Sequence, residues 1–363
     1  MNRTTPESAA TLLSMPLLTT RTWVVWRTLQ LVVWIVGLAI FVLLIVAPDI
    51  GIHAFWNVLI PVAPALVAFA PGLWRNICPL GSTALFAQHM GLSARRQMPP
   101  AWQGSLALIG VVLLLLIVPL RHVVLDTNGP ATALTIALLA VIAVLLGTQF
   151  QWKSSWCSGM CPVHPVEKLY GSEPMRSWSN VHCHRCQKCV VTCPDSVRGV
   201  SPLVPGDTGV RRVAGVLMVG GFAGFIWGWF HVPDYAGVEG WQHLARAYGL
   251  PFAGLAVTLA AYLLLERLVP EQQTVRLRRL FAAAAISCYY WYRLPALFGF
   301  GPFPGDGMLV DLRHVLPEWF PVVSRIATTT LLLWWLVWRC RGERSWLVRP
   351  PFLAGSRPQR VAV

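Results

Sequence analysis

Eight long apolar segments constrain the fold of this chain more than any other feature of its sequence. A helix needs about 20 apolar residues to cross the hydrocarbon layer of a bilayer, which is about 30 Å thick. The segments that meet this length lie at 27–47, 52–73, 102–120, 129–150, 213–232, 248–268, 277–299 and 321–339. The segment 277–299 is the least regular, because Arg293 and Pro295 lie in its last third. We expect an all-α polytopic membrane protein with about eight transmembrane helices.

The composition agrees with a chain that is surrounded by lipid. Hydrophobic residues make up 55% of it and charged residues only 12%, whereas about 25% of the residues of an ordinary soluble domain are charged. The 18 tryptophans are typical of helix ends at the membrane surface. The polar stretch 1–22 lacks the pattern of a cleavable signal peptide, so the first apolar segment is expected to remain as an anchor.

The net charge of +14 reflects membrane topology, and nucleic-acid binding is not expected. Both tails and the even-numbered connections between the apolar segments hold 24 of the 29 Lys and Arg residues. Lys and Arg are retained on the cytoplasmic side during insertion. Both termini and the cysteine-bearing loops are therefore expected on the cytoplasmic side.

The longest interruption between apolar segments divides the chain into parts. It runs from 151 to 212 and contains six of the nine cysteines. We expect an N-terminal membrane domain at 1–150 with a Cys-Pro loop at 74–101, a cytoplasmic iron-sulfur insertion at 151–212, a C-terminal membrane domain at 213–340 and a basic cytoplasmic tail at 341–363. The first four segments resemble a loose duplication, because Cys78-Pro79 and Cys161-Pro162 each follow a pair of them.

The insertion carries a complete C-x2-C-x2-C-x3-C-P run, formed by Cys183, Cys186, Cys189, Cys193 and Pro194. This spacing wraps three thiolates around one 4Fe-4S cluster, and the cysteine before proline usually reaches a second cluster. Structural zinc is disfavoured, because zinc sites more often use two separated cysteine pairs. One 4Fe-4S cluster is expected.

The other cysteines leave the number of clusters open. If Cys193 serves a second cluster, Cys161 is the natural fourth ligand of the first, and Cys193 then joins Cys157 and Cys78. The alternative is a single cluster held by the first three cysteines of the run and either Cys193 or Cys161. His164 is a less favoured ligand and is expected to form hydrogen bonds near the cluster. The predicted ligands are Cys78, Cys157, Cys161, Cys183, Cys186, Cys189 and Cys193.

The C-x3-C-P of Cys157, Cys161 and Pro162, followed by the ferredoxin run, resembles the ferredoxin-type polytopic membrane proteins of the NapH, NosR and MauN group. This resemblance covers mainly residues 20–200. It implies cytoplasmic clusters in a ferredoxin-like insertion, a bacterial-type inner membrane, and a role in quinol oxidation or in electron supply to reductases and dehydrogenases. The sequence departs from the group at Trp74, which stands where the first C-x3-C-P has its leading cysteine, and in having a single ferredoxin run.

Several histidines and cysteines outside the cysteine loops are further candidates for function. Five histidines lie near the ends of segments on the predicted outer side: His53, His122, His231, His243 and His314. The favoured interpretation is that these histidines cap helices at the membrane surface. The alternative is that one of them belongs to a quinol site, and a haem is not expected. Cys288 and Cys340 are expected to be small apolar residues of helices.

We expect a membrane-bound iron-sulfur protein that passes electrons between a cytoplasmic or membrane partner and the quinone pool or a respiratory reductase or dehydrogenase. No catalytic triad or phosphate loop is present, so an enzymatic role is expected only as a quinol dehydrogenase subunit. The alternative is a maturation factor that supplies electrons for building a metal site in a partner. A redox-gated transporter or sensor is a third and less favoured hypothesis.

Overall fold

The computed structural model describes residues 19–94, 96, 98–150, 153–182, 209–235, 238–339 and 347–348. These residues are mostly helical, with short π-helical or 3-10 segments (η) inside or beside the longer helices. The strands β1 (Trp178–Ser179) and β2 (Leu347–Val348) pair in parallel. The expectation of a helical, multi-pass protein is confirmed. Of the predicted iron-sulfur insertion at 151–212, the structure describes 153–182 and 209–212, and the cysteine run at 183–193 lies outside the described residues.

The N-terminal half consists of two helical hairpins, each followed by a Cys-Pro turn. Thr19 is the N-cap of its first helix: the Thr19 hydroxyl oxygen accepts a hydrogen bond from the Thr22 amide at 3.2 Å, and this cap satisfies an amide that has no partner in the helix. The elements in chain order are α2 (Thr20–Val46), α3 (Pro48–Ile52), η1 (His53–Leu59), α4 (Ile60–Phe69), α5 (Pro71–Ile77), α6 (Pro79–Ala84), α7 (Phe86–His89), α8 (Pro100–Leu120), η2 (Arg121–Leu125) and α9 (Gly129–Gln149).

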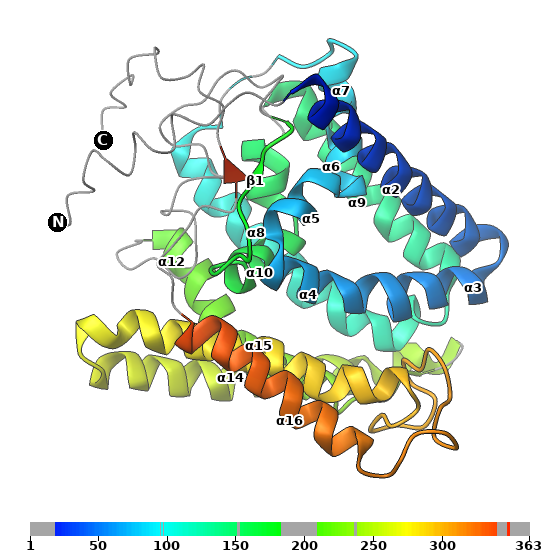
Figure 1. Cartoon of the computed structure of the whole chain (residues 1–363), viewed down its shortest axis with the longest axis vertical. Coiled ribbons are helices and arrows are strands. Elements are labelled where there is room, and N and C mark those ends of the chain that lie inside the picture. The colour runs from blue at the N-terminus through cyan, green and yellow to red at the C-terminus, as the bar shows by residue number, and fades with distance from the viewer. Residues whose placement is uncertain are drawn as a thin grey trace.

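The connector and the C-terminal half follow. The connector contains η3 (Lys153–Met160), α10 (Val163–Tyr170) and β1. The C-terminal half contains α12 (Gly209–Val216), η5 (Leu217–Gly221), α13 (Phe222–Trp229), η6 (Val238–His243), α14 (Leu244–Leu268), α15 (Glu271–Leu297), α16 (Phe320–Leu333), η7 (Trp334–Trp338) and β2. Helix α15 packs against α13 and α16, and α13 packs against α14. Figure 1 shows α14, α15 and α16 side by side, apart from α2, α3 and α9.

Seven helical stretches of the described chain are long and apolar enough to cross a membrane. They are Thr20–Val46, Pro48–Phe69, Trp102–Leu125, Gly129–Gln149, Gly209–Trp229, Gly240–Leu268 and Phe320–Trp338. Each corresponds to a predicted segment. The predicted segment 277–299 forms most of α15 but is not among the seven, because arginines at both ends and three tyrosines lower its hydropathy.

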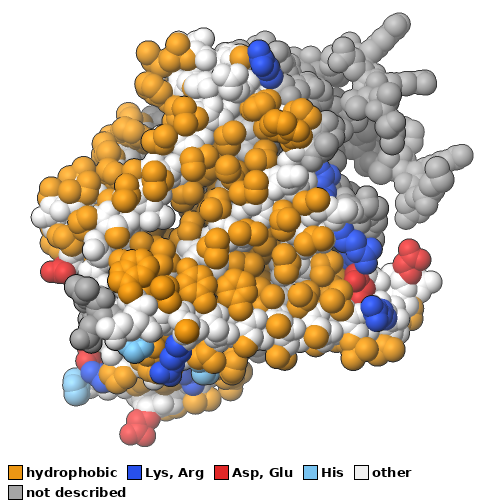
Figure 2. Space-filling view, turned by 180° about the vertical axis from the view of Figure 1, so that it is seen from behind, with side chains coloured by type: hydrophobic (Ala, Val, Ile, Leu, Met, Phe, Trp, Pro, Cys, Tyr) orange, Lys and Arg blue, Asp and Glu red, His pale blue; other side chains and the backbone are white. Residues whose placement is uncertain are grey.

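Exposed apolar side chains cover the outside of these helices. Figure 2 shows a broad, almost continuous hydrophobic face, with charged side chains gathered near its rim. On α2 alone, Leu31, Ile35 and Val46 are more than half exposed. A surface of this extent is suited to lipid, since apolar patches on soluble monomers seldom exceed a few hundred Å².

A row of glycines lets α13 and α14 approach closely. A Cβ atom added at Gly224 would lie 2.0 Å from the carbonyl oxygen of Gly254, and one at Gly228 would lie 2.3 Å from that of Leu250. Small residues four positions apart are a common way of packing helices in membranes. The Gly224 amide donates to the Thr258 hydroxyl at 3.2 Å, so the contact also includes a polar link between the two helices.

Candidate functional site

Each of the two Cys-Pro turns leads into a helix. Cys78 directly follows α5, and Pro79 is the first residue of α6; Cys161 directly follows η3, and Pro162 is the N-cap of α10. Proline is favoured at a helix start because it lacks the amide hydrogen that would be left without a partner there. The first backbone amides then point at sulfur: Leu80 and Gly81 donate to Cys78, and Val163 donates to Cys161.

The second turn is wound as a π-helix that packs closely on α8. The Cys161 amide donates to the Trp156 carbonyl at 3.0 Å, which is the i to i+5 bond of a π-helix, a feature often found at functional sites. A Cβ atom at Gly110 of α8 would lie 3.1–3.2 Å from the carbonyl oxygens of Gly159, Met160 and Cys161. Glycine at this position therefore allows the backbone before Cys161 to lie directly on α8.

Arg75 joins the two turns. Its guanidinium donates to the Cys157 carbonyl at 2.8 Å, to the Ser158 hydroxyl at 2.6 Å and to the Glu167 carboxylate at 2.9 Å. The Arg75 and Glu167 side chains are only 4% and 2% exposed. A buried ion pair of this kind needs its remaining hydrogen bonds satisfied to offset desolvation, and Cys157 and Ser158 supply acceptors for Arg75.

The residues just before the ferredoxin run form hydrogen bonds with the end of α5, next to Cys78. The Asn76 amide group donates to the Ser179 carbonyl at 2.9 Å and accepts from the Val181 amide at 3.3 Å. His182, the residue directly before Cys183, has its Nε2 atom 3.3 Å from the Arg75 carbonyl, so Nε2 is the donor. Asn76 and Val181 are fully buried, and His182 is 5% exposed.

The electrostatics of the site depend on burial. Burial raises the pKa of the Cys78 thiol, and burial together with the neighbouring Cys78 raises the pKa of Cys161 to about 12. Burial lowers the pKa of His164 to about 4. Burial alone would raise the pKa of Glu167, but the Arg75 charge outweighs it and leaves that pKa below its usual value. Without a metal, both thiols are therefore protonated, His164 is neutral and Glu167 is ionised.

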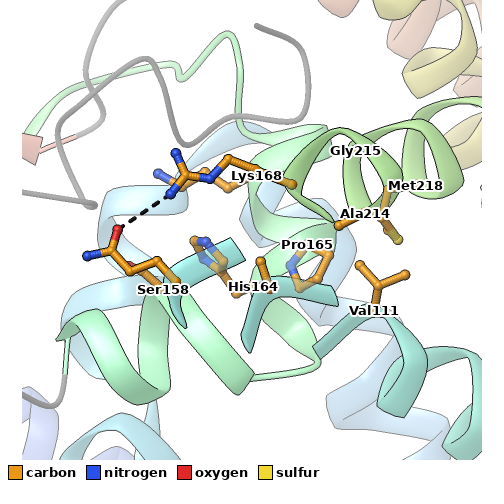
Figure 3. A pocket seen from close by; sticks show the side chains of 11 residues that line it. Val111, Ser158, His164, Pro165, Lys168, Ala214, Gly215 and Met218 are labelled. Carbon is orange, nitrogen blue, oxygen red and sulfur yellow. Dashed lines mark hydrogen bonds between the residues drawn. The ribbon is translucent and has the colours of Figure 1, made fainter. Parts of the chain in front are cut away.

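A small pocket lies beside the second turn, between α8, α10 and α12. It has a volume of about 50 Å³. Its polar lining includes Ser158, His164 and Lys168, and Figure 3 shows these side chains across from the apolar Val111 and Met218. Arg211 at the start of α12 donates to Gln103 of α8 at 3.5 Å on the same rim.

The three predicted ligands that the structure describes, Cys78, Cys157 and Cys161, lie close together. Cys78 is close enough to raise the pKa of Cys161, and Cys157 is buried in the same apolar cluster that Cys161 contacts. Cys183, Cys186, Cys189 and Cys193 lie outside the described residues. The described residues alone form no group of three His, Cys, Asp or Glu side chains that could hold a metal ion.

The donor chemistry at the turns fits an iron-sulfur cluster. An anionic cluster bound by thiolates is stabilised where the cysteine sulfurs accept backbone N–H bonds and an arginine is buried beside them.

The sequence alone did not indicate a role for Arg75, Asn76 or Glu167. The one available signal was that Arg75 and Asn76 directly precede a Cys-Pro. Cys288 lies partly buried in α15, and Cys340 is outside the described residues.

Comparisons with protein-family models, curated proteins and solved structures find no match for this chain.

Proposed function

We propose that the protein is a membrane-bound iron-sulfur electron carrier, which passes electrons between a cytoplasmic or membrane partner and the quinone pool or a respiratory reductase or dehydrogenase. The observation that carries this proposal is a pair of hydrogen bonds. The Val181 amide donates to Asn76, and His182 donates to the Arg75 carbonyl. Cys183 follows His182 directly, and consecutive Cα atoms are about 3.8 Å apart. The chain that leads into the ferredoxin run therefore lies beside the turn that carries Cys78.

The cluster ligands follow from that arrangement. Cys183, Cys186 and Cys189 would hold a 4Fe-4S cluster with a cysteine that precedes a proline as the fourth ligand, and Cys161 is the described candidate. Cys193, Cys157 and Cys78 would serve a second cluster. When bound, such a cluster supplies a one-electron redox centre. Arg75 and the amides of Leu80, Gly81 and Val163 supply the compensating positive charge.

The strand pairing supports eight membrane crossings. Strands β1 and β2 are hydrogen-bonded to each other, so residues 179 and 347 lie on the same side of the membrane and an even number of crossings separates them. Three of the seven apolar helices lie between them, and α15 is the remaining long helix. We infer that α15 is the fourth crossing, which places both termini and the cysteines on the side rich in Lys and Arg, the cytoplasmic side.

Iron analysis and electron paramagnetic resonance test the proposal. The purified, reduced protein is expected to contain iron and acid-labile sulfide and to give an iron-sulfur signal at low temperature. Cys161→Ser is expected to lose or alter that signal, whereas Cys288→Ser in α15 is expected to leave it unchanged. Protein prepared with intact cysteines that lacks both iron and signal would refute the proposal.

A deletion experiment separates electron carrier from maturation factor. The strain lacking this chain is supplied with a partner reductase whose own cofactors are already complete. A carrier role predicts that electron flow to the reductase stops. Continued flow would favour the maturation role.

A further inference from the structure

Three helix faces meet at the pocket between α8, α10 and α12. Residues four positions apart lie on the same face of a helix, and the lining follows this spacing: Gln103 and Ala107 on α8, His164 and Lys168 on α10, and Arg211 and Gly215 on α12. The pocket is therefore built by elements that are far apart in the sequence and come together only in the folded chain.

Small residues on two of these faces leave the space open. Ala107 of α8 and Ala214 and Gly215 of α12 have little or no side chain, and the pocket has a volume of about 50 Å³. A cavity needs about 10–15 Å³ to hold one water molecule, so this pocket has room for about four groups of that size. A tetrahedral group with four oxygens, such as phosphate, matches this space.

The charge of the lining is positive. Lys168 is 7% exposed, and Arg211 is half-buried at the start of α12. None of the eleven described residues in the lining is acidic. Glu167, which precedes Lys168 in the chain, forms an ion pair with Arg75 at 2.9 Å. Burial of a positive charge is costly unless an opposite charge or hydrogen bonds compensate for it, so this lining favours an anion over a cation.

Hydrogen bonds hold the guanidinium group of Arg211 at the rim of the pocket. It donates to the side-chain oxygen of Gln103 at 3.5 Å, the dashed line in Figure 3. The amide group of Gln103 in turn donates to the Met98 carbonyl at 3.2 Å, so the residue that positions Arg211 is itself held. A guanidinium group has five N–H donors in a planar fork, and such a fork matches the oxygens of a phosphate group.

The neighbours of the pocket in the sequence are exposed apolar residues. Trp102, next to Gln103, is 59% exposed, and Val210 and Val213, on either side of Arg211, are 43% and 50% exposed. Tryptophan is enriched at the level of the lipid headgroups. The rim of the pocket therefore lies where α8 and α12 enter their membrane-spanning stretches, at the depth at which phospholipids carry their phosphate groups.

We propose that this pocket binds a phosphate group, which belongs either to the headgroup of an anionic lipid or to a soluble phosphate. Lys168 binds the phosphate oxygens from inside the pocket and Arg211 binds them from the rim, and no covalent bond forms or breaks. The site goes beyond the electron-carrier proposal and does not depend on it, because no cysteine is among the described residues of its lining.

Isothermal titration calorimetry of the full-length protein in an uncharged detergent tests the site. One arm titrates inorganic phosphate and the other titrates a short-chain phosphatidylglycerol, each corrected by a titration into detergent alone. Arg211→Gln is expected to weaken binding by about tenfold or more, because a hydrogen bond between charged groups is lost. Arg212→Gln is the matched control. It removes the same charge from the next residue of α12, whose side chain is 62% exposed, and is expected to bind as wild type does.

A second variant tests the space and leaves the charge unchanged. Ala107→Leu keeps every charged side chain but places a larger apolar side chain in the pocket. It is expected to lose binding in the arm in which wild type binds. Circular dichroism and thermal unfolding in the same detergent check that each variant is folded.

The two arms distinguish the sources of the phosphate group. Tighter binding of phosphatidylglycerol supports a lipid headgroup, and binding of inorganic phosphate at least as tight supports a soluble phosphate. Absence of binding in both arms would overturn the proposal. Equal binding by wild type, Arg211→Gln and Ala107→Leu would also overturn it, because the anions would then follow the overall charge of +14 and not this pocket.

Discussion

Arg75 contacts both η3 and α10, the elements on either side of Cys161. It comes from the helix before Cys78, and its partners Cys157, Ser158 and Glu167 lie more than 80 positions later in the chain. Removing one member of a buried ion pair leaves the other charge without compensation. The contribution of Arg75 is therefore inseparable from that of Glu167.

A double-mutant cycle tests this coupling. Arg75→Met and Glu167→Gln are each expected to destabilise the protein by about 3–5 kcal/mol, and the double variant by clearly less than the sum, because neither charge is then left alone. Thermal unfolding in detergent measures all three variants. Arg313→Ala, at an exposed pair, is the control and is expected to change little. Additive effects of the two substitutions would contradict the coupling.

The sequence was sufficient to bring the cysteine turns together but not to identify what holds them. Cys78, Cys157 and Cys161 were expected on one face because each follows a pair of apolar segments, and the structure brings them to one end of the helices. The pairing of Arg75 with Glu167 was not predictable, because a contact between residues 92 positions apart leaves no local pattern. The role of Asn76 was missed for the same reason. The ligand role of the run from Cys183 to Cys193 stays a prediction.

At the scale of elements, the contact between α8 and η3 sets the position of Cys161. Three consecutive carbonyl groups of the π-helical turn lie over Gly110. A side chain at this position would push the backbone of the turn away from α8 and with it the sulfur of Cys161. Helix α8 thus acts as the surface against which the ligand loop is positioned.

Gly110→Ala is expected to displace that loop. The added methyl group costs about 1–3 kcal/mol through overpacking and is expected to lower the iron bound per chain. Gly104→Ala, on the same helix, is the matched control: its Cβ would lie 3.7 Å from Arg211, an ordinary contact, and alanine gains up to about 1 kcal/mol in helix propensity. Equal iron content in the two variants would show that the close approach at Gly110 does not matter for the site.

At the scale of the whole molecule, hydropathy and structure give different evidence on α15. Its composition falls short of a membrane span because Arg276, Arg278 and Arg279 lie in its first third and Arg293 in its last. Arg278 and Arg279 pair with Glu266 and Glu173, and Arg293 is buried. Hydropathy treats these charges as isolated, whereas the fold pairs Arg278 and Arg279 with carboxylates and buries Arg293.

Reporter fusions test whether α15 crosses the membrane. A reporter that is active only in the cytoplasm is joined after Pro270, after Asp311 or after Val363. We expect activity at the first and third positions and none at the second, because α15 and α16 each reverse the side. Activity after Asp311 would mean that α15 stays on the cytoplasmic side.

The pairing of β1 with β2 has a consequence for the order of synthesis. Trp178 and Ser179 are made long before their partners Leu347 and Val348, and between them the ribosome must produce every helix of the C-terminal half. The segment that enters the cysteine run therefore acquires its strand partner only when insertion into the membrane is nearly finished. If the run binds a cluster as proposed, cluster loading can precede the closing of this ladder.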